Sequence, residues 1–239
     1  MKFSDLISEY YESEALKIYF RLKVLDASYY VFEQNYGELM ELLTKIREPA
    51  NYEKLWNDKK GLDMHLLELT RLLHNLVASV MSLVEHTRII INAHYKGTNF
   101  YDEYEKEKKN RFVNNRITGF VQELRNYTLH YGLPFATANL GLEVDPGTQE
   151  TTFTNPITLD KARLLEWGGW TQKKGKPYLD AADDHIEIQI IMEEYSQAAR
   201  DFQQWMWNRL QDIHADELKW LEKTKREIRK ALGDLPRPT

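Results

Sequence analysis

Apolar residues recur at helical spacing over most of the chain, and the most regular run lies in its first half. Between residues 61 and 96 the apolar positions alternate steps of four and three without a break. They are Leu62, Leu66, Leu69, Leu73, Leu76, Val80, Leu83, Thr87, Ile90 and His94. Such a heptad seam predicts a long helix that packs along a partner of similar length. Further apolar residues widen the stripe, so we expect this helix at the centre of a bundle.

A long helix is predicted on each side of the central one. Residues 4–48 end before Pro49, which cannot continue a helix, and Gly37 is the candidate point of division. Their apolar face consists of Leu16, Phe20, Val24, Ala27 and Val31. Residues 183–232 form the last helix, with a cap at Asp183 or Asp184. Its seam consists of Ile188, Ile191, Tyr195, Ala198, Phe202, Trp205, Arg209 and Ile213.

A shorter amphipathic helix precedes residue 131. Its apolar positions are Val113, Ile117, Phe120, Val121 and Leu124. Gly132 can take the left-handed conformation that closes a helix and Pro134 cannot continue one, so the helix should end near Tyr131. Residues 135–155 then predict a β-hairpin around a Pro-Gly turn, beside the end of this helix.

The remaining segments are short or charged. Residues 99–110 carry interleaved acids and lysines and are predicted to be a solvated connection. A short helix should begin at Thr158 or Asp160 and end at Gly168, and the tail from about residue 233 should fray. These patterns together predict an all-α antiparallel bundle of long helices with a small β-hairpin insertion, in a single domain over residues 1–239.

Composition narrows the functions that this bundle can have. The chain has no cysteine, which excludes disulfides, thiolate metal sites and a cysteine nucleophile. The segment after Met1 is mixed rather than apolar, and no stretch suggests a membrane span, so we expect a cytoplasmic protein. The net charge of −5 argues against a protein that coats nucleic acid nonspecifically but leaves room for a local RNA-cutting site. No zinc motif or glycine-rich phosphate loop is present, and we expect no cofactor.

A compact polar group lies at the end of the helix before residue 131. It consists of Arg125, Asn126 and His130. The guanidinium is an always-charged fork for a phosphate, and the imidazole can exchange a proton near neutral pH. Asn126 and His130 are four residues apart on one helix face, where the amide can orient the ring. Arg125 lies about 100° round the helix from Asn126, but its long side chain can turn toward the same opening.

An Arg, four to six residues and a His, with a polar residue directly after the Arg, resembles the signature of the HEPN superfamily. Members are helical ribonucleases of toxin–antitoxin modules, abortive-infection systems and RNA-guided CRISPR nucleases. The motif covers six residues here, and two other pairs have similar spacing: Arg88 with His94, and Arg209 with His214. Only Arg125 is followed by a small amide, and only His130 is followed, after Tyr131, by a Gly-x-Pro helix stop.

The resemblance implies a homodimer with a composite cleft and metal-independent cleavage of RNA by attack of its 2′-hydroxyl group. Arg125 and His130 would be catalytic, with Asn126 orienting His130 or contacting the phosphate. Residues that would bind the RNA substrate are Tyr131, Lys109, Arg111 and Arg116, since basic residues before the motif helix can guide an RNA backbone toward it.

The partner and the activity stay open at this point. HEPN toxins with a nucleotidyltransferase antitoxin often carry a Tyr two residues after the His, where this chain has Gly132, with Tyr131 adjacent instead. This departure argues against a nucleotidyltransferase antitoxin. The resemblance still allows an antitoxin or defence-system partner, and an abortive-infection or phage-defence role fits it equally well. A non-catalytic helical dimerisation or interaction module is the alternative to a ribonuclease. A metal enzyme using Glu85, His86 and His94 is a weaker third hypothesis.

Overall fold

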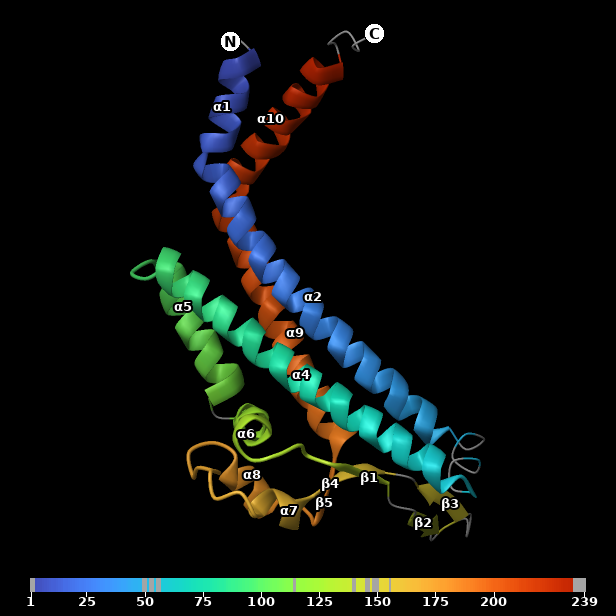
Figure 1. The fold of residues 1–239 in the computed structure, drawn as a ribbon. Helices are drawn as coiled ribbons and strands as arrows, with labels where there is room; N and C mark the ends of the chain where they lie inside the picture. Colours follow the sequence, from blue (N-terminus) through green and yellow to red (C-terminus); the bar gives the residue numbers. More distant parts are fainter. Residues whose placement is uncertain are drawn as a thin grey trace.

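The computed structural model of the protein describes residues 3–48, 51, 54, 57–113, 115–138, 141–144, 147, 151–154 and 156–233. The described chain is mostly helical, with long helices along its length and small antiparallel strands gathered at one end (Figure 1). The predicted all-α class with a small β insertion is therefore confirmed. The Pro146 turn position and the tail from residue 234 lie outside the described residues.

The centre of the fold is an antiparallel pair of long helices, α2 (Glu14–Arg47) and α4 (Lys59–His94), which lie side by side (Figure 1). The middle of the predicted α4 seam, from Leu69 to Thr87, is buried at every seam position. The prediction of a long central helix with a long partner is confirmed.

Of the predicted α2 face, only Leu16 is buried as expected among its large apolar residues. Phe20, Val24 and Val31 are exposed, Phe20 by 58%. The other residues that pack inward are Ala15, Ile18, Leu22, Leu25, Phe32, Leu39, Leu43 and Ile46. Both stripes have helical spacing, and contact with α4 and α9 (Ile188–Ile213) buries the second one.

Two predicted long helices are each divided by a polar residue. Ser13, not Gly37, separates α1 (Phe3–Glu12) from α2, and its hydroxyl caps α2 by accepting from the Leu16 N–H at 3.1 Å. His214 separates α9 from α10 (Ala215–Gly233). The outer helices α1 and α10 pack together, and α10 also packs against α2 (Figure 1).

By length and composition alone, α4 could cross a membrane, which the sequence analysis did not anticipate. This observation is weak, because a core helix of a soluble protein passes the same test. The apolar seam of α4 faces α2 and α6 (Arg116–His130) inside the fold.

The segment predicted as a solvated connection is a helix, α5 (Asn99–Lys108). Thr98 caps it, and Phe100 and Tyr104, four residues apart, are buried against α9. A five-residue π-helix, η1 (Lys109–Val113), follows directly. The predicted apolar position Val113 therefore lies outside α6 and is exposed.

Two small sheets lie at one end of the molecule. The predicted hairpin is confirmed in β2 (Gly141–Val144) and β3 (Thr151–Thr154), with Leu142 opposite Phe153. An unpredicted sheet joins β1 (Ala136–Ala138), β4 (Ile157–Asp160) and β5 (His185–Glu187). Because β5 occupies the expected start of the last helix, the predicted cap at Asp183 or Asp184 is wrong.

Short helices follow β4. Asp160, one of the two predicted starts, caps α7 (Lys161–Leu165) by accepting from the Arg163 N–H at 3.0 Å. A loop then leads to α8 (Lys176–Ala181), which packs on α6.

Candidate functional site

The predicted site lies on the last two turns of α6, which ends at His130 as expected. The closing bonds run from the backbone N–H groups of Tyr131 and Gly132 to the carbonyl of Tyr127, at 3.0 and 3.1 Å. Gly132 is not left-handed: among the glycines that the structure describes, Gly97 alone has a positive φ. The position of the helix end is confirmed, but its predicted left-handed closure is wrong.

Arg125 is half-buried and turns toward its neighbour. Its Nη1 donates to Oδ1 of Asn126 at 3.4 Å. Within the part of the chain that the structure describes, no carboxylate lies within ion-pair distance of this guanidinium. In the described structure Asn126 makes no hydrogen bond to His130, and its amide oxygen lies at the long end of hydrogen-bond distance from the guanidinium of Arg125.

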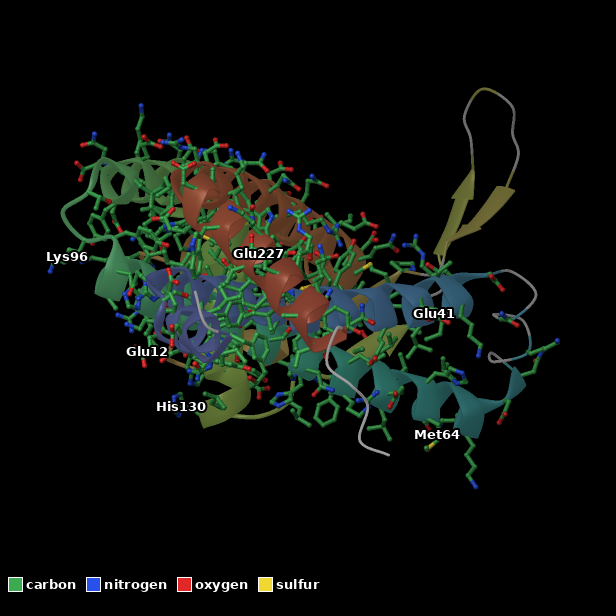
Figure 2. The ribbon with its side chains drawn as sticks, turned by 90° about the horizontal axis from the view of Figure 1, so that it is seen from above. Glu12, Glu41, Met64, Lys96, His130 and Glu227 are labelled. Atoms are coloured by element: carbon green, nitrogen blue, oxygen red, sulfur yellow. The ribbon has the colours of Figure 1, made fainter. Side chains whose placement is uncertain are left out.

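His130 is exposed at the end of α6, where Figure 2 shows it at the edge of the molecule. Five residues of α-helix turn through 500°, so Arg125 and His130 leave the helix about 140° apart. Arg125 bends toward Asn126, which shares a helix face with His130, but no hydrogen bond joins the Arg125 and His130 side chains in the described structure.

The two competing pairs are engaged in structural contacts. Arg88 donates to Glu85 at 2.6 Å, and Arg209 donates to Glu103 through two nitrogens, at 2.8 and 3.0 Å. His214 is hydrogen-bonded to the Tyr95 hydroxyl at 2.8 Å. Burial lowers the pKa of His214, which disfavours its charged form. Of the three pairs, Arg125–His130 alone leaves the arginine without a carboxylate and the histidine exposed in the described structure.

The metal hypothesis is not supported by the placement of its residues. Glu85 is paired with Arg88, and Nδ1 of His86 lies 2.7 Å from the Ser28 hydroxyl. In the ranges that the structure covers, no group of three or more His, Asp or Glu side chains is placed to hold a metal ion.

The predicted substrate-binding cations lie away from the motif. Lys109 and Arg111 are in η1, and Arg111 is paired with Glu107 at 2.9 Å. Arg116 begins α6, so at 1.5 Å rise per residue it lies about 21 Å along the axis from His130. Arg116 instead lines a cavity that does not include Arg125, Asn126 or His130.

Tyr131, the fourth predicted substrate residue, is beside the motif. Its hydroxyl donates to Glu166 at 3.1 Å, and this bond raises the pKa of Tyr131. The surface around it is apolar: Leu129, Tyr131, Leu133 and Phe135 are each between 44% and 51% exposed. A group of large exposed apolar residues beside polar ones is typical of an interaction surface.

Glu123, two residues before Arg125, is a buried carboxylate that the sequence analysis missed. It is 3% exposed and accepts hydrogen bonds from the backbone N–H and hydroxyl of Thr171 and from the Gly175 N–H. These bonds hold the loop of residues 171–175 against α6. The sequence does contain a signal for this buried carboxylate, because Glu123 is an acidic residue within the apolar helix stripe that contains Phe120 and Leu124.

Gly119 allows the same loop to approach the helix. A Cβ at this position would lie 2.8 Å from the backbone carbonyl carbon and oxygen of Lys174. The close contact brings Lys173 and Lys174 to the mouth of the cavity that Arg116 also lines.

Comparison with models of known protein families, with curated protein sequences and with solved structures finds no match to this chain.

Proposed function

We propose that the protein is a metal-independent endoribonuclease of toxin or phage-defence type, acting as a homodimer in the cytoplasm with Arg125 and His130 as catalytic residues. The observation that carries the proposal is that Arg125 and His130 are both available. Arg125 has no carboxylate partner among the described residues, whereas Arg88 and Arg209 are neutralised by glutamates. An unpaired guanidinium next to an exposed imidazole suits a phosphate-cleaving site better than a structural one.

A dimer supplies what one chain lacks. Because Arg125 and His130 diverge on a single helix, a two-fold axis beside the end of α6 would set His130 of one copy against Arg125 of the other. The exposed residues Leu129, Leu133 and Phe135 offer an apolar surface for that contact. An interface of this kind would also exclude water from the groups that meet there.

General acid–base cleavage of RNA needs two proton transfers. His130 of one copy would take the proton from the 2′-hydroxyl, whose oxygen then attacks the adjacent phosphorus. The bond from phosphorus to the 5′ oxygen breaks, and His130 of the second copy would protonate that leaving oxygen. Arg125 would stabilise the negative charge on the pentavalent phosphate, held in place by Asn126. The products would carry a 2′,3′-cyclic phosphate and a 5′-hydroxyl group.

The remaining basic residues would act farther along the strand. Arg116 lies at the opposite end of α6, so it would contact RNA some nucleotides away from the cleaved bond. An antitoxin or another defence protein would restrain the nuclease at rest, and the apolar surface around Tyr131 is available to such a partner as well.

The experiment is RNA cleavage in EDTA by the wild type, Arg125→Ala and His130→Ala, with the double variant R88A/H94A as a matched control. The control removes an Arg–His pair of similar spacing from a surface outside the site. We expect each single variant to lose at least about 100-fold in cleavage rate, His130→Ala because an acid–base group is lost and Arg125→Ala because stabilisation of the transition-state charge is lost, and the control to retain wild-type activity. Equal activity in all four proteins would contradict the assignment.

A non-catalytic interaction module is the second candidate. The divergence of Arg125 and His130 and the exposed apolar surface around them favour it. A folded, dimeric wild type that cuts none of several single-stranded RNAs, with or without added metal, would support this module over the nuclease.

A further inference from the structure

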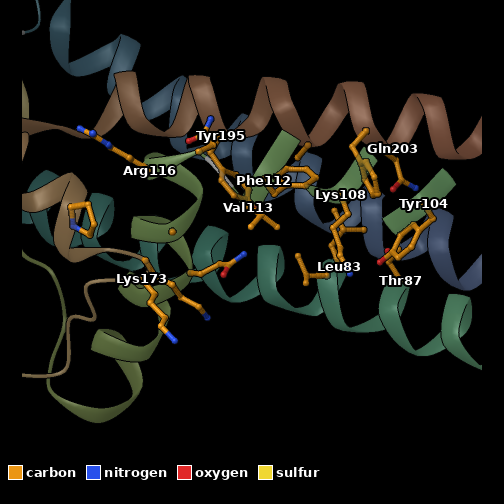
Figure 3. Close-up of a pocket in the computed structure, with 18 residues that line it drawn as sticks. Leu83, Thr87, Tyr104, Lys108, Phe112, Val113, Arg116, Lys173, Tyr195 and Gln203 are labelled. Atoms are coloured by element: carbon orange, nitrogen blue, oxygen red, sulfur yellow. The ribbon is translucent and has the colours of Figure 1, made fainter. Parts of the chain in front are cut away.

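A cavity of about 530 Å³ lies between α4, α5, η1, α6 and α9, away from the motif. Figure 3 shows it as elongated, with Arg116 and Lys173 at one end and Thr87, Tyr104 and Gln203 at the other. Its volume falls within the usual range for small-molecule sites, about 300–1,000 Å³. One wall is the π-helix η1, through Phe112 and Val113, and such helices are frequent at functional sites.

Polar side chains along the cavity have no hydrogen-bond partner in the described protein. Thr87, Tyr104, Tyr195 and Gln203 are each 4–6% exposed, and none of their side chains makes a hydrogen bond to another described residue. Burial raises the pKa of Tyr195, so its hydroxyl stays protonated and can donate. Their polar atoms remain accessible from the cavity rather than fully buried, so all four can hydrogen-bond to a polar ligand there.

Aromatic rings form the walls between these polar groups. Phe112 and Phe202 have ring centroids 5.2 Å apart, and Tyr104 and Phe202 lie 5.7 Å apart. All three line the cavity. A planar ring is the ligand shape that such walls bind best, since its faces can stack on theirs.

The charged residues that line the cavity are all cations: Lys108, Arg116, Lys173 and Lys174. Lys108 is paired with Glu105 at 2.5 Å. The other three have no carboxylate partner in the described chain, and the Glu123 bonds to the 171–175 loop fix the backbone that carries the two lysines. This mouth therefore suits an anion with several negative charges, such as a phosphate group.

We propose that the cavity binds a 5′-nucleotide, with its base against the rings of Phe112 and Phe202 and beside Gln203, and its phosphates at Arg116, Lys173 and Lys174. The amide of Gln203 offers both a donor and an acceptor to a base edge. A fatty acid would satisfy the cations and the apolar walls, but its chain would displace water from the four polar groups without replacing their hydrogen bonds, at a cost of about 1–3 kcal/mol for each group. A nucleotide would pair with the cations, stack on the aromatic walls and hydrogen-bond to the polar side chains.

The test is isothermal titration calorimetry of the full-length protein with the four ribonucleoside 5′-monophosphates and the four 5′-triphosphates, each separately. Adenosine, ribose 5-phosphate and decanoate serve as probes of the base, the anion and an apolar chain. We expect at least one nucleotide to bind with a Kd below about 1 mM, more tightly than any of the three probes.

Two variants locate the binding. K173A/K174A removes two cations from an exposed loop and Gln203→Leu removes the inner amide; each should raise the Kd of the bound nucleotide at least about tenfold. K59A/K60A, an adjacent exposed lysine pair at the start of α4, is the matched control and should leave the Kd unchanged. His130→Ala should also bind normally, which separates this site from the proposed nuclease.

Three results would overturn the proposal. They are the absence of binding by all eight nucleotides at about 1 mM, binding that neither cavity variant weakens, and binding of decanoate alone. Circular dichroism of each variant checks that a loss of binding does not come from unfolding.

Discussion

The buried carboxylate of Glu123 accepts two hydrogen bonds from Thr171, one from its backbone N–H at 2.9 Å and one from its hydroxyl at 2.6 Å. The two residues are 48 positions apart in the chain. Their contact holds the 171–175 loop against α6, two residues before Arg125. The helix that carries the proposed catalytic motif therefore also positions the loop whose lysines line the cavity.

Glu123→Gln should destabilise the fold. The amide keeps one acceptor but turns an NH₂ group toward N–H donors, so at least one buried donor loses its partner, at about 1–3 kcal/mol. Urea unfolding measures the change. Glu41→Gln, an exposed glutamate on α2, is the control and should stay within about 0.5 kcal/mol of the wild type. Equal stability of the two variants would show that Glu123 does not anchor the loop.

Gly119→Ala and Gly37→Ala should have opposite effects. Both glycines are inside helices, where alanine is intrinsically favoured by about 0.5–1 kcal/mol. A Cβ at Gly37 meets nothing within 4 Å, so that variant should gain about this amount. At Gly119 the Cβ would collide with the Lys174 backbone, and the overpacking should cost about 1–3 kcal/mol. Thermal melts that rank Gly119→Ala at or above the wild type would contradict the close approach.

His214 should make stability fall in mild acid. Burial lowers its pKa in the folded protein below the ordinary 6.5, so the unfolded chain takes up this proton first as the pH falls. The contribution is present above about pH 6.5 and is lost as the pH decreases through 6.5 toward the lowered folded pKa. His214→Gln should therefore flatten the decline in unfolding free energy between about pH 7.5 and 5.5. His94→Gln, at an exposed position, should retain the wild-type slope; a His214→Gln slope equal to it would refute the effect.

Leu133→Glu should weaken the dimer that the nuclease proposal requires. Leu133 is 44% exposed beside the motif, and a charge at an apolar interface is costly to bury. We expect the dimer dissociation constant, measured by analytical ultracentrifugation, to rise at least about tenfold. Ile89→Glu is the matched control, since Ile89 is 55% exposed on α4 outside this surface. A dimer that survives Leu133→Glu but not Ile89→Glu would place the interface elsewhere.

Helical periodicity made the long helices predictable from the sequence. It did not show which of two possible helix faces packs against a neighbouring element. The α4 seam was clear because its steps of four and three continue through Leu83 and Thr87. The wrong face of α2 was chosen because two stripes fit one helix, and only contact with other elements decides which is buried. The helix α5 was missed because its charges hide the apolar pair Phe100 and Tyr104.

For the candidate site too, local features were predictable from the sequence and contacts between distant residues were not. The helix end at His130 follows from local signals that a sequence contains. The loop on Glu123 and the cavity around Gln203 depend on residues far apart in the chain, so helical spacing alone does not reveal them. Tyr195 was predicted as a seam residue, and its role in lining the cavity follows only from the fold.

The central claim is that the Arg125–His130 helix end cleaves RNA through the 2′-hydroxyl, and the end groups of the products test it most directly. The wild-type dimer would be incubated with single-stranded RNA in EDTA and the fragments analysed by mass spectrometry. The account predicts 2′,3′-cyclic phosphate and 5′-hydroxyl ends, with neither formed by His130→Ala. Cleavage that requires added metal, or fragments with 5′-phosphate and 3′-hydroxyl ends, would contradict it.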